Sequence, residues 1–422
     1  MPPVQGKSGT TTTPAATLGA AAWIDHLLQR RTDANHRFFA AHADRIARLC
    51  HRMAERFARG GRLVAFGHAA APRSDVRHVA VEFVHPVIVG KRALPALGLA
   101  SEGGPLAAQV ELLAEPEDIA IAFGTDERGG DSDTAAALDA AHRRGCLTIA
   151  FSPAGAAWEF VPPSDDPFVR QELVETLYHV LWELVHVFFE HRGLLHGREA
   201  RTVHDIGAPG FLYPFLAERE NDLESVVGDV RASVLLKADE VAALRARTLS
   251  EGRDALAAAA TALRAAFDGG GRLFALGNGG SATDAMDVVA DFREPPRGWP
   301  ARPAVDLTED AAILTAIMND VGPELIFSRQ IIAHGRAGDA VLALSTSGGS
   351  RNVIEALAEA RRRAMVTVAL VGYGGGRIAA EGLADHVIVT PSEHIPRIQE
   401  AQASAYHVLR ELVELAGADA PS

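Results

Sequence analysis

The sequence repeats itself, and this repeat constrains the fold more than any other feature of the chain. Residues 60–67 read GGRLVAFG, and residues 270–277 read GGRLFALG, an offset of 277 − 67 = 210 positions. Each copy follows a long segment with apolar residues at helical spacing and opens a short apolar run typical of a buried strand. Later landmarks recur in the same order: 117–123 with 338–344, 145–150 with 365–370, Gln171-Glu172 with Gln399-Glu400, and Tyr178-His179 with Tyr406-His407. The repeat therefore predicts two copies of one fold in tandem.

Each copy alternates apolar strands with helical patterns, which favours an α/β fold with a parallel sheet covered by helices on both faces. We expect two three-layer α/β/α domains with flavodoxin-like sheets, each led by a long helical segment. The expected boundaries are a disordered tail over 1–18, a first domain over 19–195, a linker over 196–221 and a second domain over 222–418.

Composition excludes several classes of function. The chain has 422 residues, 48% of them hydrophobic, and a formal net charge of −13, which argues against a general binder of nucleic acid or membrane surfaces. Its two cysteines, Cys50 and Cys146, make a disulfide framework or a thiolate metal site unlikely. The sequence shows neither a long apolar span nor a signal peptide, so we expect a cytoplasmic protein.

A glycine-rich loop opens the second copy. Gly277-Asn278-Gly279-Gly280-Ser281 lies between an apolar run and a helix-compatible segment over 282–292, with Ser281 expected to cap the helix. Two glycines let backbone N–H groups approach an anion, and the N-terminus of a helix favours negative charge. No lysine follows the glycines, so the loop is not a Walker motif. It predicts a phosphate cradle, although an ordinary strand-to-helix turn explains this stretch alone equally well.

A second loop shifts the balance towards phosphate. Residues 345–350 read STSGGS and follow a predicted buried strand over 340–344. Hydroxyls and backbone amides can hold a phosphomonoester without Lys or Arg, and both loops would lie at the carboxyl edge of one parallel sheet. The predicted phosphate-binding residues are Asn278, Gly279, Ser281, Ser345, Thr346, Ser347 and Ser350.

Four motifs in order resemble the sugar isomerase (SIS) family, and most closely its phosphoheptose isomerase branch: GNGGS at 277–281, LTAIMND at 314–320, STSGGS at 345–350 and RIQE at 397–400. The resemblance covers roughly residues 222–415. It implies SIS-type domains that convert sedoheptulose 7-phosphate to glycero-manno-heptose 7-phosphate through an enediol, with a divalent metal, zinc in the family. It also implies substrate contacts from Asp310 and Gln399.

The family pattern places His and Glu four residues apart on one helix, and Gln and His eight apart on another, as metal ligands and as the catalytic base and acid. In the first copy the matching metal ligands are His78, Glu82, Gln171 and His179, with Glu82 and His179 as base and acid. In the second copy Asp287 and Asp291 replace His and Glu, while Gln399 and His407 remain, so Asp291 and His407 are the catalytic counterparts. The first copy lacks both phosphate loops, since 67–72 and 124–132 replace them.

The two copies are therefore complementary, and we expect a composite site in which the second grips the phosphate of a heptose phosphate and the first moves the proton. The resemblance further implies a homodimer that forms a pseudo-tetramer of SIS domains. Two alternatives remain open. One is a non-catalytic sugar-phosphate sensor or protein-binding module of the replication-initiator-binding type, and the other is an isomerase of a hexulose or aminosugar phosphate.

Overall fold

The structure is a computed structural model that describes residues 19–88, 91–124, 132–190, 222–295 and 298–416. The expected tail over 1–18 and the expected linker over 196–221 lie outside the described residues. In the described part of the chain, Cys50 and Cys146 are buried and free, and no helix there is both long and apolar enough to cross a membrane.

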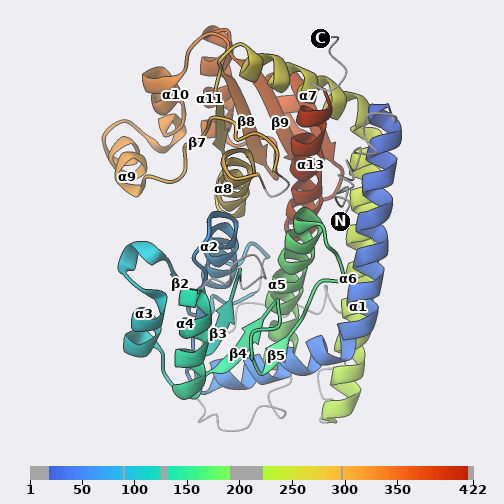
Figure 1. The fold of residues 1–422 in the computed structure, drawn as a ribbon, viewed down its shortest axis with the longest axis vertical. Coiled ribbons are helices and arrows are strands. Elements are labelled where there is room, and N and C mark those ends of the chain that lie inside the picture. Colours follow the sequence, from blue (N-terminus) through green and yellow to red (C-terminus); the bar gives the residue numbers. More distant parts are fainter. Residues whose placement is uncertain (1–18, 89–90, 125–131, 191–221, 296–297, 417–422) are drawn as a thin grey trace, which may run out of the picture.

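Two parallel sheets of five strands form the framework (Figure 1). The first has the order β2-β1-β3-β4-β5, with β1 (Leu63–Phe66), β2 (Ala96–Leu99), β3 (Ile119–Ala122), β4 (Leu147–Ala150) and β5 (Trp158–Glu159). The second has the order β7-β6-β8-β9-β10, with β6 (Leu273–Leu276), β7 (Ala304–Asp306), β8 (Ala340–Ser345), β9 (Val366–Gly372) and β10 (His386–Thr390). The two orders are the same once the repeat is applied, which confirms the parallel, flavodoxin-like α/β fold.

The register repeats as well. Leu63 of β1 pairs with Ile119 of β3, and Leu273 of β6 pairs with Ala340 of β8. Strands β1, β3, β4, β6 and β8 are buried along their whole length, as expected for a parallel sheet with both faces covered.

Helices connect and cover these strands. In the first half they are α1 (Ala20–Ala58), α2 (Ala70–Val84), α3 (Leu106–Leu113), α4 (Ser132–Arg143) and α5 (Pro167–Glu190), with a 3₁₀ turn at Ser101–Gly103. In the second half they are α6 (Leu223–Glu251), α7 (Arg253–Asp268), α8 (Gly280–Arg293), α9 (Ala311–Asp320), α10 (Ser328–His334), α11 (Arg351–Arg362), α12 (Gly376–Ala380) and α13 (Ile395–Leu415), with a 3₁₀ turn at Pro323–Leu325.

The long helices α1 and α6 pack side by side and tie the two halves together (Figure 1). Ile24 and Leu27 of α1 belong to the hydrophobic cluster around the second sheet. Residues of α6 from Val226 to Ala238 belong in turn to the cluster around the first sheet. Each half thus contributes helix surface to the core of the other, and burial of that apolar area stabilises the pair as one unit.

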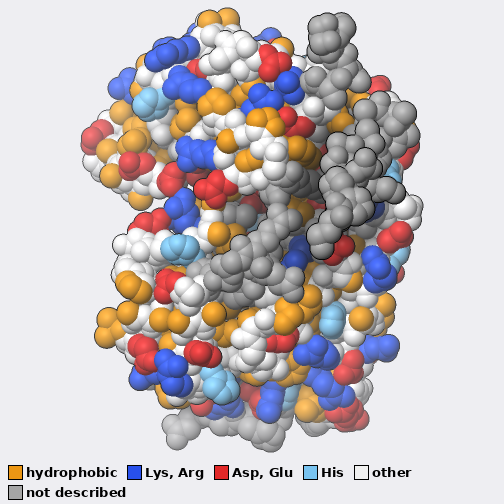
Figure 2. All heavy atoms as spheres, in the orientation of Figure 1, with side chains coloured by type: hydrophobic (Ala, Val, Ile, Leu, Met, Phe, Trp, Pro, Cys, Tyr) orange, Lys and Arg blue, Asp and Glu red, His pale blue; other side chains and the backbone are white. Residues whose placement is uncertain are grey.

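Two further helix pairs cross between the halves. Helix α2 packs against α8, and α5 packs against α13, so the paired helices are equivalent under the repeat. This arrangement brings side chains of both halves to one central region. On the face shown in Figure 2, acidic and basic side chains are interspersed, and the surface is hollowed between the part that carries α9 and the part that carries α3.

Candidate functional site

The glycine-rich loop ends at the bare N-terminus of α8. Gly279 is the N-cap residue, with φ 57° and ψ −126°, and no side chain caps the helix. The expectation that Ser281 caps α8 is therefore wrong: Ser281 lies in the first turn and donates its backbone N–H to the Asn278 carbonyl. A glycine is required at the cap because an L-residue with a side chain rarely adopts this conformation. The uncapped turn leaves amide N–H groups for an anion.

The hydroxyl-rich loop has a similar form. Helix α11 starts after Ser350, which makes no side-chain capping bond. The Ser345 hydroxyl accepts from Gly348 N at 3.2 Å, and the Ser347 hydroxyl accepts from Gly349 N at 3.2 Å, so these two side chains shape the loop. Ser347 is exposed and Thr346 is half-buried, which leaves hydroxyls at the surface of the loop.

An amide pair joins the two loops. Asn278 Nδ2 donates to Asn352 Oδ1 at 3.0 Å, and Asn352 Nδ2 donates back to Asn278 Oδ1 at 2.8 Å. The contact confirms that both loops lie at the same edge of the second sheet. Because Asn352 is in the first turn of α11, the pair also sets the two helix N-termini side by side.

Asp310, expected to contact substrate, is the N-cap of α9. Its Oδ1 accepts from Ala312 N at 2.9 Å and from Ile313 N at 3.0 Å. A capping Asp is a common stabilising feature of a helix start. Asp310 is exposed and lines a surface pocket beside α9, and its contact with substrate stays a prediction.

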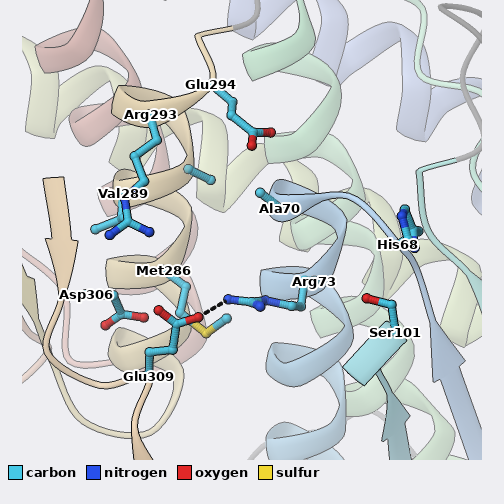
Figure 3. A pocket seen from close by; sticks show the side chains of 11 residues that line it. His68, Ala70, Arg73, Ser101, Met286, Val289, Arg293, Glu294, Asp306 and Glu309 are labelled. Atoms are coloured by element: carbon cyan, nitrogen blue, oxygen red, sulfur yellow. Dashed lines mark hydrogen bonds and ion pairs between the residues drawn. The ribbon is translucent and has the colours of Figure 1, made fainter. Parts of the chain in front are cut away.

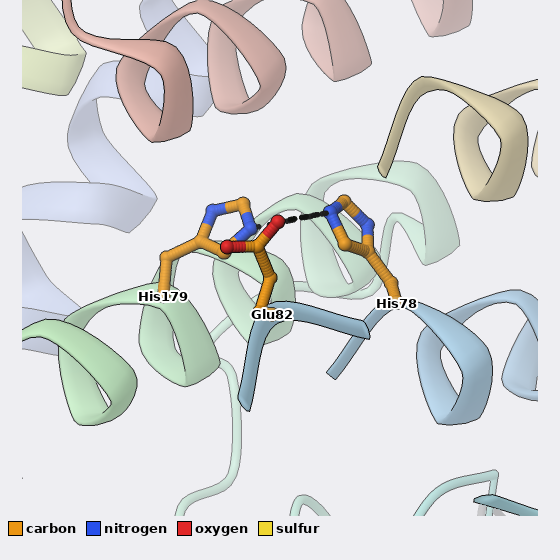
Figure 4. A group of neighbouring side chains, drawn as sticks. All are labelled: His78, Glu82 and His179. Atoms are coloured by element: carbon orange, nitrogen blue, oxygen red, sulfur yellow. Dashed lines mark hydrogen bonds and ion pairs between the residues drawn. The ribbon is translucent and has the colours of Figure 1, made fainter. Parts of the chain in front are cut away.

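A buried cluster forms where α2 meets α5. His78 and Glu82 share one face of α2, and His179 of α5 points at them (Figure 4). His78 Nε2 lies 3.3 Å from His179 Nε2 and 3.9 Å from Glu82 Oε1. All three side chains are at most 3% exposed, and Glu82 Oε2 has no hydrogen-bond partner.

The fourth member comes from the other half of the chain. Gln399 on α13 places its amide nitrogen 3.1 Å from His78 Nε2, and its Oε1 has no hydrogen-bond partner. The expected fourth ligand, Gln171, instead donates to Asp75 Oδ1 at 3.2 Å. The assignment of Gln171 to this cluster is therefore corrected to Gln399.

Helix geometry explains the correction. Eight residues along an α-helix correspond to about 12 Å of rise, so the backbones of Gln171 and His179 lie too far apart for both side chains to reach one ion easily. Helices α5 and α13 pack against each other, and Gln399 of α13 approaches His78, which also contacts His179 of α5. The spacing of eight residues shows that Gln171 and His179 share a helix face, but it does not account for the distance between them along the helix axis.

The cluster fits a tetrahedral metal. Ligand atoms about 2.1 Å from a tetrahedral ion lie about 3.4 Å from one another, close to the separations of 3.3, 3.1 and 3.9 Å around His78 Nε2. Rotation of the Gln399 amide by 180° directs an oxygen at the same point. Two imidazoles, a carboxylate and an amide oxygen form a donor set suited to zinc.

Glu400 fixes the orientation of His179. His179 Nδ1 donates to Glu400 Oε1 at 3.0 Å, which directs Nε2 into the cluster. Arg397 pairs with Glu400 and also with Glu183, at 2.7 Å. Gln399-Glu400 and Gln171-Glu172 are repeated pairs in the sequence, but no role is predicted for their glutamates from the sequence. Their position beside a repeated glutamine was the available signal.

Burial governs protonation here. It raises the pKa of Glu82 to about 8, with help from the charges of Glu183 and Glu400. Burial, with Arg397, lowers the pKa of His179 to about 3, and burial lowers the pKa of His78 well below its usual value. Without a metal the cluster therefore carries neutral imidazoles and a protonated Glu82 near neutral pH, the forms that desolvation favours.

The phosphate loop and this cluster meet at Gly280. A β-carbon at Gly280 would lie 2.8 Å from His78 Nε2 and 1.9 Å from Gln399 Nε2. The first residue of α8 is therefore in direct contact with the cluster supplied mainly by the other half. The loop of the second half and the cluster of the first half therefore adjoin each other, and the composite site stays a prediction.

A second cluster occupies the equivalent place under the repeat. Asp287 and Asp291 of α8 lie beside His407 of α13, and their potential ligand atoms all lie within 4.8 Å of one another. His407 Nδ1 contacts Glu172 Oε1 at 2.9 Å, just as His179 contacts Glu400. Ser74, one turn into α2, donates to Asp287 Oδ1 at 3.2 Å, so this cluster adjoins the first half, whose loop lacks the glycine pair.

The region around that first-half loop is a mixed-charge pocket of about 270 Å³ (Figure 3). His68, Ala70 and Arg73 form one wall, and α8 with the residues after β7 forms the other. Arg73 is already paired with Glu309 at 2.6 Å and with Glu102 at 2.7 Å. Asp306 and Glu294 also lie in the lining, together with Arg293, so positive and negative side chains offset each other around this pocket.

Comparisons with known proteins agree with the fold. The model of the SIS domain family matches residues 238–372. Phosphoheptose isomerase of Geobacter metallireducens is 45% identical over 163 residues, which are 38% of this chain and 84% of that protein. Phosphoheptose isomerase of Roseiflexus sp. is 41% identical over 196 residues, which are 45% of this chain and 91% of that protein. The solved tagatose-6-phosphate ketose/aldose isomerase of Escherichia coli aligns over 95% of both chains with a TM-score of 0.54 and 16% identity, so it shares the fold.

Proposed function

The chain belongs to the SIS domain family, and we propose that it is an aldose–ketose isomerase of sugar phosphates with one composite site. The second half would bind the phosphate through the loops at Asn278–Ser281 and Ser345–Ser350. The cluster of His78, Glu82, His179 and Gln399 would act on the sugar carbons. The observation that carries the proposal is the contact at Gly280, where a β-carbon would lie 2.8 Å from His78 Nε2.

The chemistry needs a group that moves a proton between neighbouring carbons. Glu82 would remove a proton from C1 of the ketose to give an enediol and return it to C2. His179 would pass a proton from the C1 oxygen to the C2 oxygen, so that the aldose forms with no net gain or loss of protons. Glu400 supports this role because it holds the His179 ring in one orientation through Nδ1.

A divalent metal belongs in this proposal because the donor set suits zinc. His78, Glu82 and Gln399 would hold it, which leaves Nε2 of His179 free to carry the proton and one position of the ion open. A bound cation supplies stabilisation of the negative charge that develops on the enediol oxygens. Burial of the cluster strengthens that stabilisation, since charges interact more strongly where water is excluded.

We propose sedoheptulose 7-phosphate as the substrate, supported by the identity of 45% to a phosphoheptose isomerase. The test incubates zinc-loaded protein with sedoheptulose 7-phosphate in deuterium oxide and follows the product by proton NMR. We expect formation of the aldose, with deuterium at C2 in those turnovers in which the proton on Glu82 exchanges with solvent before it reaches C2. Binding of the sugar phosphate without turnover would favour a sensor. If a parallel panel shows turnover of only a hexulose or aminosugar phosphate, that compound is the substrate in place of sedoheptulose 7-phosphate.

We also propose a homodimer. Helix α9 has no buried residue although its sequence is largely apolar, and Ile313 and Met318 are 38% and 48% exposed. Its counterpart α3 exposes Leu112 at 80%. Both helices project on the same side of the molecule in Figure 1, so a second copy would cover both apolar surfaces. Light scattering of the wild type and of Ile313→Asp tests this proposal, and a monomeric wild type contradicts it.

A further inference from the structure

The second cluster, made of Asp287, Asp291 and His407, has no part in the proposed reaction. All three residues are at most 6% exposed. Asp287 and Asp291 are four residues apart, so they share one face of α8 and meet His407 across the packing of α8 on α13. Two buried carboxylates this close repel each other unless a positive charge lies between them.

The distances in this cluster match coordination better than hydrogen bonding. His407 Nε2 lies 3.4 Å from Asp287 Oδ2 and 3.4 Å from Asp291 Oδ2. Hydrogen bonds from nitrogen to oxygen are about 2.7 to 3.2 Å long. Atoms that share a tetrahedral ion at about 2.1 Å are about 3.4 Å apart. The nitrogen lies equally far from the two oxygens, so the three atoms can face one common point, as the ligands of a single ion do.

A second observation points to a ligand at that point. Asp291 Oδ2 has no hydrogen-bond partner although the residue is 6% exposed. His407 Nδ1 is occupied by Glu172, at 2.9 Å, so Nε2 is the nitrogen that faces the two carboxylates. A carboxylate on the far nitrogen of a histidine is the usual partner of a metal-binding imidazole.

We propose that Asp287, Asp291 and His407 form a second divalent-cation site, which is structural and which joins α8 to α13. Its two carboxylates make it a harder donor set than the first cluster, so it takes Mn²⁺ as well as Zn²⁺. Tyr406 donates its hydroxyl to Asp287 Oδ2 at 2.9 Å and Ser74 donates to Oδ1 at 3.2 Å, which orients this carboxylate. Without a phosphate loop beside it, the site holds its ion but turns over no sugar phosphate.

The test counts ions. Protein stripped with a chelator is reloaded with Zn²⁺, freed of excess metal by gel filtration and analysed by mass spectrometry of the metal. The wild type should retain two ions per chain, Asp291→Asn one, His78→Ala one, and the double variant none. Asp291→Asn preserves side-chain shape, and circular dichroism verifies that each variant is folded.

The outcomes separate this site from the first. One ion per chain in the wild type that is lost in His78→Ala but kept in Asp291→Asn overturns the second site and leaves the proposed function intact. One ion that is lost in Asp291→Asn but kept in His78→Ala supports the second site and removes the metal from the first. Electron paramagnetic resonance after loading with Mn²⁺ should show a bound-ion signal that Asp291→Asn abolishes. A wild type with only the free-ion spectrum means that a proton on His407 holds the cluster together, which also overturns the proposal.

Discussion

Glu400 Oε1 lies 3.0 Å from His179 Nδ1, although the two residues are 221 positions apart in the chain. The pair joins α13 of the second half to α5 of the first. The repeat generates the same contact in the opposite sense, between Glu172 and His407 at 2.9 Å. Each half therefore orients the histidine of the other, and neither cluster is complete within one half.

Glu400 should act as a positioning residue. Glu400→Gln keeps the size of the side chain but weakens the hydrogen bond to His179, so kcat should fall about 10- to 100-fold with KM little changed. Steady-state kinetics of zinc-loaded protein measures the split. Glu172→Gln is the matched variant in the second cluster and should leave turnover per folded molecule unchanged. An equal loss in both variants would mean that the effect is structural.

Glu82→Gln and His179→Ala should separate binding from turnover. Loss of the proton-transfer group should reduce kcat about 100- to 10,000-fold. Affinity for the sugar phosphate should survive, because the phosphate loops belong to the other half. Calorimetric titration together with the NMR assay tests both statements, and full activity in both variants rules out the composite site.

Gly280→Ala should disrupt the composite site while the fold persists. The added β-carbon would lie 1.9 Å from Gln399 Nε2 and 2.8 Å from His78 Nε2, so these ligands must move. Metal retention and turnover should both fall at least about 10-fold. Gly228→Ala on the exposed face of α6 is the control, because its β-carbon meets nothing within 4 Å. It should raise stability by about 0.5 to 1 kcal/mol with activity unchanged.

Asn352→Ala should weaken phosphate binding without direct loss of a catalytic group. The change removes both hydrogen bonds to Asn278, of 3.0 and 2.8 Å, which hold the two loops together. The Kd for the sugar phosphate should rise about 3- to 10-fold, the effect of about 1 kcal/mol per net hydrogen bond at a partly exposed site. An unchanged Kd would show that the loops are set by their helices alone.

Metal-free protein should lose stability as the pH rises from about 4.5 to about 8 through Glu82. The pKa of Glu82 is about 8 in the folded chain, against a usual value of 4.5. The folded state therefore keeps a proton that the unfolded state releases in this range, and a state that binds more protons is favoured at lower pH. Urea denaturation at several pH values measures the slope. Glu82→Gln should flatten it, and an identical slope in that variant contradicts the shift.

The sequence predicted the fold well because the repeat and the strand pattern are strong local features. The presence of two copies of one fold followed from GGRLVAFG and GGRLFALG, the parallel sheet followed from the alternation of strands and helices, and the loops lie where the glycines and hydroxyls indicated. His78, Glu82 and His179 were predicted from their match to the pattern of the SIS family, and the structure brings their side chains together. Features of the site that depend on packing between helices could not be predicted from local sequence patterns. To replace Gln171 by Gln399 in the cluster, one must know the distance along α5 between Gln171 and His179. To predict the contact of Asn352 with the other loop, one must know that α11 approaches α8.

Capping was misjudged for a different reason. A serine after two glycines resembles an N-cap, but a positive φ at Gly279 starts α8 earlier and moves Ser281 inside the helix. The role of Asp310 as the N-cap of α9 likewise follows from backbone geometry, which residue types only suggest.

The covalent link between the halves has an evolutionary consequence. In a homodimer of identical subunits, every substitution appears at both equivalent positions, so a change that harms one active centre harms the other. When duplicated copies are fused in one chain, as they are here, a substitution appears once. Asp287 can then depart from histidine, and residues 67–72 can abandon the glycine pair, while selection preserves the centre built around His78. Fusion thus permits asymmetry that a symmetric ancestor had no means to explore.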